Sequence, residues 1–245
     1  MSMSIRVKPF QIMNLILLLG LHLIAVFALP ACTSTERVEL EGYTFHDQWA
    51  EVNNCGHGLF QGDLTIDMYV KLLEYPENWL SFIKKCPKDE ICQFNLRIKN
   101  KNRGQFYYGT RTRPLILKWN PEPDLPLNEW VRLTAVRNMA ENTLSLFING
   151  NPVARSEKNL PPPALTSAPL MILHSREQAA RAKLFSVRIW NRAFDSLDIN
   201  RTANPLACSA RIQGMLGCWI FTPGKALTIA DSSQKSGPAS IMRAN

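Results

Sequence analysis

The sequence predicts an all-β fold, a two-sheet antiparallel jelly-roll sandwich that contains one short helix. After residue 42, hydrophobic and polar residues alternate with a period of two in most segments, which is typical of half-buried strands. Turn signals such as Asn149-Gly150 separate these segments at short intervals. About ten short strands joined by frequent turns indicate a β-sandwich or jelly roll.

The expected elements follow one another along the chain. The clearest strand covers residues 64–72, where every second residue is hydrophobic. Asp195 can cap a helix that begins at Ser196, and Pro205 limits its length. The other expected strands are residues 94–98, 105–108, 115–119, 130–136, 144–148, 170–173, 183–190 and 217–221.

Composition and charge limit the class of protein. The 245 residues are 46% hydrophobic, which is enough for an ordinary hydrophobic core. This excludes an intrinsically disordered chain, a collagen-like fibre and a membrane protein with many helices. The chain is basic, with a formal charge of +8 from 28 Lys and Arg against 20 Asp and Glu. We expect one domain, since all-β sandwiches often reach about 200–250 residues.

The first 31 residues predict a signal peptide. Arg6 and Lys8 precede an apolar run over residues 15–29, and the small residue Ala31 follows this run. This order is that of a secretory signal, whereas a membrane-spanning helix needs about 20 apolar residues. We therefore expect residues 1–31 to direct export, with an uncleaved signal anchor as the alternative.

The end of this segment, Leu29-Pro30-Ala31-Cys32, resembles a bacterial lipobox, in which Cys32 becomes the lipidated first residue. Lipid on Cys32 would attach the protein to the cell envelope without a spanning helix. Residues 32–41 would then form a polar stalk. The alternative is simple cleavage and secretion, so contact with a membrane is expected only through a lipid anchor.

Export would place the remaining cysteines in an environment where disulfides persist. Cys86 and Cys92 enclose a short polar loop that one disulfide can close. Cys208 and Cys218 form the second expected disulfide. Cys55 could replace either partner of this second pair, because spacing does not fix connectivity.

Motifs for a metal, a cofactor or a nucleic acid are missing from the sequence. Cys55-Gly56-His57 is a single potential ligand pair, and no second Cys/His pair stands at zinc spacing. Gly-rich phosphate loops and a G-x-S-x-G nucleophile elbow are also absent. We therefore expect no metal site, no cofactor and no nucleic-acid partner.

Four stretches of the chain, taken in order, are similar to one known family. Their order and spacing resemble the laminin-G-like, concanavalin A-like jelly roll, and residues 217–221 add its closing strand. The resemblance covers residues 42–235 and leaves residues 236–245 as a C-terminal tail. The four stretches are residues 63–71 (DLTIDMYVK), 129–136 (EWVRLTAV), 144–153 (LSLFINGNPV) and 184–194 (LFSVRIWNRAF).

This resemblance implies a domain that binds glycans, proteins or lipids, in some members through calcium. Calcium needs several oxygen ligands, and the acidic residues of this chain are scattered, so no strong calcium site is expected. Glycosidases of this architecture carry Glu-x-Asp-x-x-Glu on one strand, a pattern that this sequence lacks. We therefore expect a non-catalytic extracytoplasmic recognition module for a glycan or a surface protein. The alternatives are a carbohydrate-active enzyme (hydrolase or lyase) on the same fold and a structural envelope component.

One ligand-binding patch can be placed if the expected strands turn their hydrophobic residues inward. Asp67, Tyr69, Arg97 and Arg132 then point outward. On one concave sheet they would form a polar patch with an aromatic side chain, which suits a sugar or an acidic group. The alternative is a solvated face with ordinary cross-strand pairs.

A second patch is basic and could attract anionic glycans, lipopolysaccharide or anionic lipid headgroups. The alternative is that these charges serve solubility. The patch consists of Arg97, Lys99, Lys101, Arg103, Arg111, Arg113 and Lys118.

Overall fold

The computed structural model describes the chain from residue 40 to residue 243, with internal gaps. The described residues are 40–53, 55, 59–87, 92–101, 103–109, 114–119, 124–157, 160–175, 181–224 and 228–243. The expected signal peptide, the lipidation residue Cys32 and the stalk up to residue 39 lie outside them. In the part of the chain that is described, no helix combines the length and hydrophobicity needed to cross a membrane.

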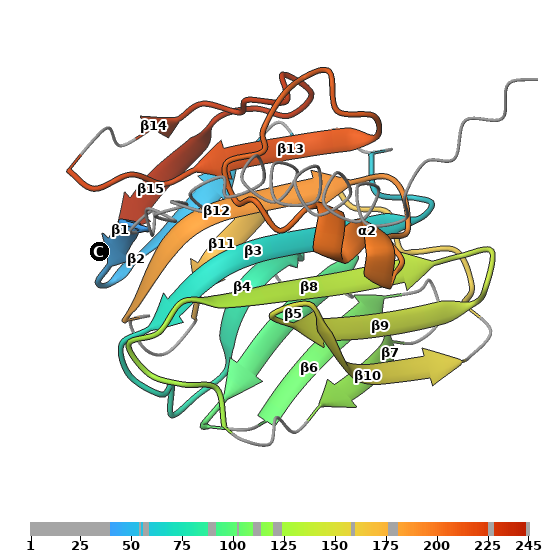
Figure 1. The fold of residues 1–245 in the computed structure, drawn as a ribbon. Helices are drawn as coiled ribbons and strands as arrows, with labels where there is room; N and C mark the ends of the chain where they lie inside the picture. Colours follow the sequence, from blue (N-terminus) through green and yellow to red (C-terminus); the bar gives the residue numbers. More distant parts are fainter. Residues whose placement is uncertain are drawn as a thin grey trace, which may run out of the picture. The chain divides into compact units, whose positions relative to one another are not determined.

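Two antiparallel sheets form a sandwich, which confirms the predicted fold class (Figure 1). The first, sheet A, runs in the order β1 (Tyr43–Phe45), β12 (Ala182–Trp190), β3 (Leu64–Leu72), β8 (Val131–Asn138), β9 (Thr143–Ile148) and β10 (Asn151–Glu157), and β13 (Met215–Ile220) also pairs with β12. The second, sheet B, runs in the order β14 (Thr228–Ile229), β15 (Ala239–Arg243), β2 (Gln48–Val52), β11 (Leu170–His174), β4 (Leu80–Lys85), β5 (Phe94–Lys99), β6 (Arg103–Gly109) and β7 (Pro114–Trp119).

Alternation along the strands builds the core between the sheets. In β3, Leu64, Ile66 and Met68 are fully buried in the main hydrophobic cluster. Each such side chain stabilises the fold by roughly 1.5–3 kcal/mol relative to an exposed one. Asn149 and Gly150 link β9 to β10 with positive φ angles of 50° and 83°, as the tight hairpin expected at this position requires.

Every strand expected from the sequence is present, and the described residues form six further strands: β1, β2, β4, β10, β14 and β15. The last of these corrects one domain boundary. Residues 239–243 were expected in a tail, but they form β15, which pairs with β2 from Ala239↔Val52 to Arg243↔Gln48. The C-terminal residues are therefore an integral part of sheet B.

A third layer covers the outer face of sheet A. It contains the helix α2 (Ser196–Arg201), which lies in front of β3 and β8 in Figure 1. Asp195 caps this helix, as expected, because its Oδ1 accepts a hydrogen bond of 2.7 Å from the backbone N–H of Asp198. A second hydrophobic cluster joins the layer to the sheet. Its buried members are Val136, Phe147, Trp190, Phe194, Ile199, Met215 and Cys218.

Candidate functional site

The four residues predicted to bind ligand do not share one face. Asp67 and Tyr69 on β3 and Arg132 on β8 lie on the outer face of sheet A, whereas Arg97 lies on β5 in sheet B. The expectation that these residues form one polar patch on one sheet is wrong, because Arg97 belongs to the other sheet and the third layer covers Asp67 and Arg132. The alternative of a solvated face does not apply to Asp67 and Arg132 either. Asp67 is 0% exposed and Arg132 is 4% exposed.

Asp67 instead forms the centre of a buried ion cluster with Arg132 and Arg188. Its Oδ1 accepts hydrogen bonds from Nε of Arg132 at 2.6 Å and from Oγ1 of Thr134 at 2.7 Å. Its Oδ2 accepts two hydrogen bonds from Arg188, which stands directly opposite Asp67 on β12. Both oxygens of the carboxylate are thus satisfied within the protein, as a buried charge requires.

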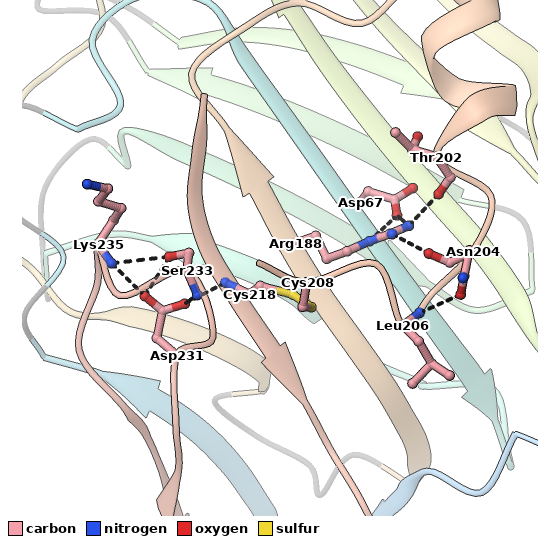
Figure 2. Close-up of a disulfide and its surroundings, with 10 residues drawn as sticks. All are labelled: Asp67, Arg188, Thr202, Asn204, Leu206, Cys208, Cys218, Asp231, Ser233 and Lys235. Atoms are coloured by element: carbon pink, nitrogen blue, oxygen red, sulfur yellow. Dashed lines mark hydrogen bonds and ion pairs between the residues drawn. A yellow bond between two sulfur atoms is a disulfide. The ribbon is translucent and has the colours of Figure 1, made fainter. Parts of the chain in front are cut away.

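The two arginines extend this cluster to the third layer. Arg132 donates to the carbonyl of Ile199 at 2.7 Å and to Oγ1 of Thr202 at 3.0 Å. Arg188 donates to the carbonyls of Thr202 and Asn204 at 2.8 and 2.6 Å, as Figure 2 shows. The ion cluster therefore fastens α2 and the following residues to sheet A.

Tyr69 takes part in the same attachment. Its hydroxyl donates to the carbonyl of Ala203. Burial raises the pKa of Tyr69, which keeps this hydroxyl protonated as a donor at neutral pH. The geometry thus gives Asp67, Tyr69 and Arg132 a common role in holding the third layer in place.

The open face of the sandwich is the outer face of sheet B, where a groove of about 1320 Å³ lies across β4, β5, β6 and β11. We call it the sheet B groove. Its described lining residues are Asn78, Trp79, Ser81, Lys84, Cys86, Pro87, Cys92, Asn95, Arg97, Lys99, Tyr107, Thr166, Ser167, Ala168, Pro169, Met171, His174 and Ser175.

Arg97, in the sheet B groove, contacts two aromatic rings and one glutamine side chain. Its guanidinium carbon lies over the ring of Trp79, 4.3 Å from the centroid, and 6.0 Å from the centroid of Tyr107. Gln105, opposite Arg97 on β6, accepts hydrogen bonds on Oε1 from Nε at 2.9 Å and Nη2 at 2.6 Å. Burial lowers the pKa of Arg97, yet an arginine remains charged at neutral pH.

Lys84 and His174 form a second polar pair in the sheet B groove. The Lys84 Nζ lies 3.0 Å from Nδ1 of His174, and the edge of the Trp49 ring packs against the His174 ring at 5.3 Å. A lysine ammonium can only donate, so in this contact Nδ1 of His174 is the unprotonated acceptor. The pair adds a second basic side chain to the lining of the groove.

The described lining of the sheet B groove is positively charged. Lys84, Arg97 and Lys99 line it, and its described lining contains no Asp or Glu. Asn95, also in the lining, is 7% exposed, and its side-chain oxygen has no hydrogen-bond partner among the described residues. The groove therefore offers cations, an aromatic surface and an acceptor for a hydroxyl donor.

Only part of the predicted basic patch belongs to this groove. Arg97 and Lys99 line it, while Arg103 on β6 and Lys118 on β7 are exposed on the neighbouring strands. Lys101 lies over the ring of Tyr75, 5.8 Å from its centroid. The other two members, Arg111 and Arg113, lie outside the described residues.

The two predicted disulfides, Cys86–Cys92 and Cys208–Cys218, are confirmed. Cys86–Cys92 closes the β4–β5 connection and lines the sheet B groove. Cys208–Cys218 ties the third layer to β13 (Figure 2). Cys55 is a free, buried thiol, and burial raises its pKa to about 11. Among the described residues, no cluster of three or more His, Cys, Asp or Glu could hold a metal ion.

Sequence reasoning missed most of the sheet B groove. Tyr107 and Gln105 could have been found, because they alternate with buried residues in an expected strand and face the same way as Arg97. Trp79 lies just before β4, in a segment without periodicity. Arg188 was missed as well, since its position opposite Asp67 depends on the pairing of β3 with β12.

Comparison with known proteins places this geometry in context. A laminin-G family model described as the concanavalin A-like lectin/glucanases superfamily matches residues 45–200. No curated protein matches the sequence.

Two solved structures illustrate the likeness. A Bacteroides ovatus protein described as a candidate carbohydrate-binding protein superimposes with a TM-score of 0.64 at 13% identity, over 84% of this chain and 61% of that chain. The binding domain of botulinum neurotoxin DC, solved in complex with SialylT, has a TM-score of 0.51 at 13% identity, over 66% of this chain and 42% of that chain. This chain thus matches less than two thirds of the length of each, and at these identities the likeness concerns the fold alone.

Proposed function

Because the chain belongs to the concanavalin A-like lectin/glucanases superfamily, we propose that it is a non-catalytic recognition module that binds an acidic glycan in the sheet B groove. The observation that carries this proposal is Arg97, which is held against Trp79 and Tyr107 on the open face of the sandwich. Sugar sites commonly combine an apolar surface with a few placed polar groups. Here the aromatic rings offer the surface, and the guanidinium offers the charge.

The charge of the groove supports an anionic ligand. Lys84, Arg97 and Lys99 together give a positive potential, which concentrates anions near a concave surface. The neighbouring Arg103 and Lys118 add positive charge at its margin. A neutral glycan would gain hydrogen bonds but no ionic attraction from these cations.

Binding without hydrolysis agrees with the same lining. Glycoside hydrolysis ordinarily uses two carboxyl groups on either side of the scissile bond. The described lining of the sheet B groove supplies none. The two similar structures, a candidate carbohydrate-binding protein and a toxin binding domain with a SialylT ligand, also favour glycan recognition.

The same proposal includes export. Residues 1–31 direct secretion and Cys32 carries lipid, so that the domain is displayed on the cell envelope. Two disulfides support an extracytoplasmic location, since disulfides are rare in reducing compartments. Intact mass of the mature protein tests both points, because it reports the acyl chains and the disulfides together.

The binding test compares the full-length protein with Trp79→Ala on an array of neutral and acidic glycans, followed by calorimetry with the best ligand. The variant should lose about thirtyfold in affinity, because ring contact and cation–π support for Arg97 each contribute about 1 kcal/mol. Trp130→Ala is the matched control. Trp130 lies beside β8 in sheet A, where its Nε1 donates to the carbonyl of Leu40.

Circular dichroism establishes that both variants are folded. An array without any bound glycan, or equal affinity of Trp79→Ala and wild type, would contradict the proposed site. Release of new reducing ends from the bound glycan would contradict a non-catalytic role.

A further inference from the structure

Arg97 has a definite set of N–H groups left for a ligand. A guanidinium carries five N–H donors, of which one on Nε and one on Nη2 are occupied by Oε1 of Gln105. No other hydrogen bond of this side chain is present among the described residues. The remaining donors include the terminal edge, where Nη1 and Nη2 each point one N–H in the same direction.

The surroundings keep this terminal edge in one orientation. Trp79 holds the flat face of the guanidinium, and the two bonds to Gln105 fix its rotation in the plane. A side chain that is ordered before binding loses little further conformational entropy when a ligand arrives. The edge is therefore a ready receptor for two oxygens that lie side by side.

We infer that the acidic group of the glycan is a carboxylate, as in a uronic or sialic acid, and that it sits on the terminal edge of Arg97 through two parallel N–H···O bonds, with Gln105 as the positioning residue. This inference rests on the proposed function and specifies its ligand class. A carboxylate has two coplanar oxygens that match the two N–H groups. A sulfate ester can also place two oxygens on this edge, but its third terminal oxygen leaves the guanidinium plane and finds no donor there.

The fork geometry also separates arginine from lysine at this position. Lysine presents a compact point charge, so it attracts any anion but does not match a planar pair of oxygens. Arg97→Lys therefore keeps the positive charge of the groove and removes the planar pair of N–H donors. Gln105→Leu keeps the arginine and removes the two bonds that orient it.

The test measures calorimetric affinities of the full-length protein for oligogalacturonate, for its methyl ester and for a sulfated neutral oligosaccharide of equal length and charge. Sialyllactose and its methyl ester form a second pair, which distinguishes a sialic from a uronic acid. Wild type should bind at least one carboxylate form about tenfold more tightly than the corresponding ester, since a charge-assisted bidentate pair contributes roughly that factor. The preference over the sulfated sugar should be severalfold, because a sulfate keeps its charge and two of its oxygens but leaves the third without a donor. Arg97→Lys and Gln105→Leu should each reduce the ratio of carboxylate to sulfate affinity to about one.

Arg155→Gln is the control, because it removes an exposed arginine on β10 of sheet A, outside the sheet B groove, and it should leave this ratio unchanged. Equal binding of carboxylate and sulfate by wild type would overturn the carboxylate fork while the proposed acidic-glycan site stands. Equal binding of the methyl ester would overturn the inference as well. Tighter binding of a poly-glutamate peptide than of any sugar would contradict a glycan as the ligand but would still agree with carboxylate binding by Arg97. The proposed function and this inference can therefore fail separately.

Discussion

At the scale of single residues, Asp67 was expected to be exposed from its place in the sequence, but it is fully buried. Alternation along β3 places it on the outer face of sheet A, beside Thr65 and Tyr69. There it is fully buried between two guanidinium groups. Such a cluster stabilises the fold only while all its charged members are present. If one member is removed, the remaining charges are buried without a partner.

Replacing Asp67 should therefore be costly. Asp67→Asn leaves Arg132 and Arg188 buried without their counter-ion, and the free energy of unfolding should fall by about 3–5 kcal/mol. Urea denaturation measures this loss. Glu141→Gln is the control, because its pair with Arg155 is exposed by more than half on both sides and such pairs contribute about 0–1 kcal/mol. Equal losses in both variants would contradict the role assigned to the cluster.

At the scale of elements, the two disulfides act on opposite sides of the sandwich. Cys86–Cys92 shapes the β4–β5 connection at the sheet B groove. Cys208–Cys218 holds the third layer against β13 on the other sheet. They should therefore affect different properties of the protein.

The paired serine variants separate these properties. Cys86→Ser with Cys92→Ser should weaken glycan binding severalfold, because one wall of the groove loses its closure. Cys208→Ser with Cys218→Ser should lower the free energy of unfolding by about 2–3 kcal/mol, the range for a short closed loop, and leave the affinity unchanged. Calorimetry and urea denaturation measure the two effects. A loss of affinity only in the second variant would argue against a binding site on sheet B.

Sequence patterns reached some elements and missed others for physical reasons. β3 is clear because one side of it faces the core, and α2 is clear because Asp195 caps it. β4 gives no alternation, since all six of its residues are buried and its register shifts between Ser81 and Ile83. The sheet B groove was missed for a related reason, because it draws on β4, on β11 and on loops that meet only after folding.

The same limit applies to the ligand patch expected from sequence. Periodicity assigns a side chain to a face of its strand but does not say what lies on that face. Asp67 and Arg132 were assigned correctly to an outer face, and residues far along the chain, around Thr202, then cover it. Arg97 was assigned to an outer face that stays open.

At the scale of the whole molecule, positive net charge should control how the protein meets its ligand; it is +8 for the whole sequence and +6 without residues 1–31, which contain Arg6, Lys8 and no acidic residue. Raising NaCl from about 50 to 500 mM should weaken binding to an acidic glycan by about tenfold or more, since salt shortens the range of the attraction. The effect should appear mainly in the association rate, measured by surface plasmon resonance. A flat response to salt would show that charge does not guide recognition. Thermal unfolding across the same salt range controls for changes in stability.

The pairing of β2 with β15 joins an early strand of the described chain to the last one. β2 is made before most of the described strands, and β15 is the last of them. During synthesis, β2 therefore waits for all the intervening strands before its outer neighbour arrives. A truncated product would keep a bare strand edge open to other chains. Sheet B therefore closes on this side only once β15 has been made.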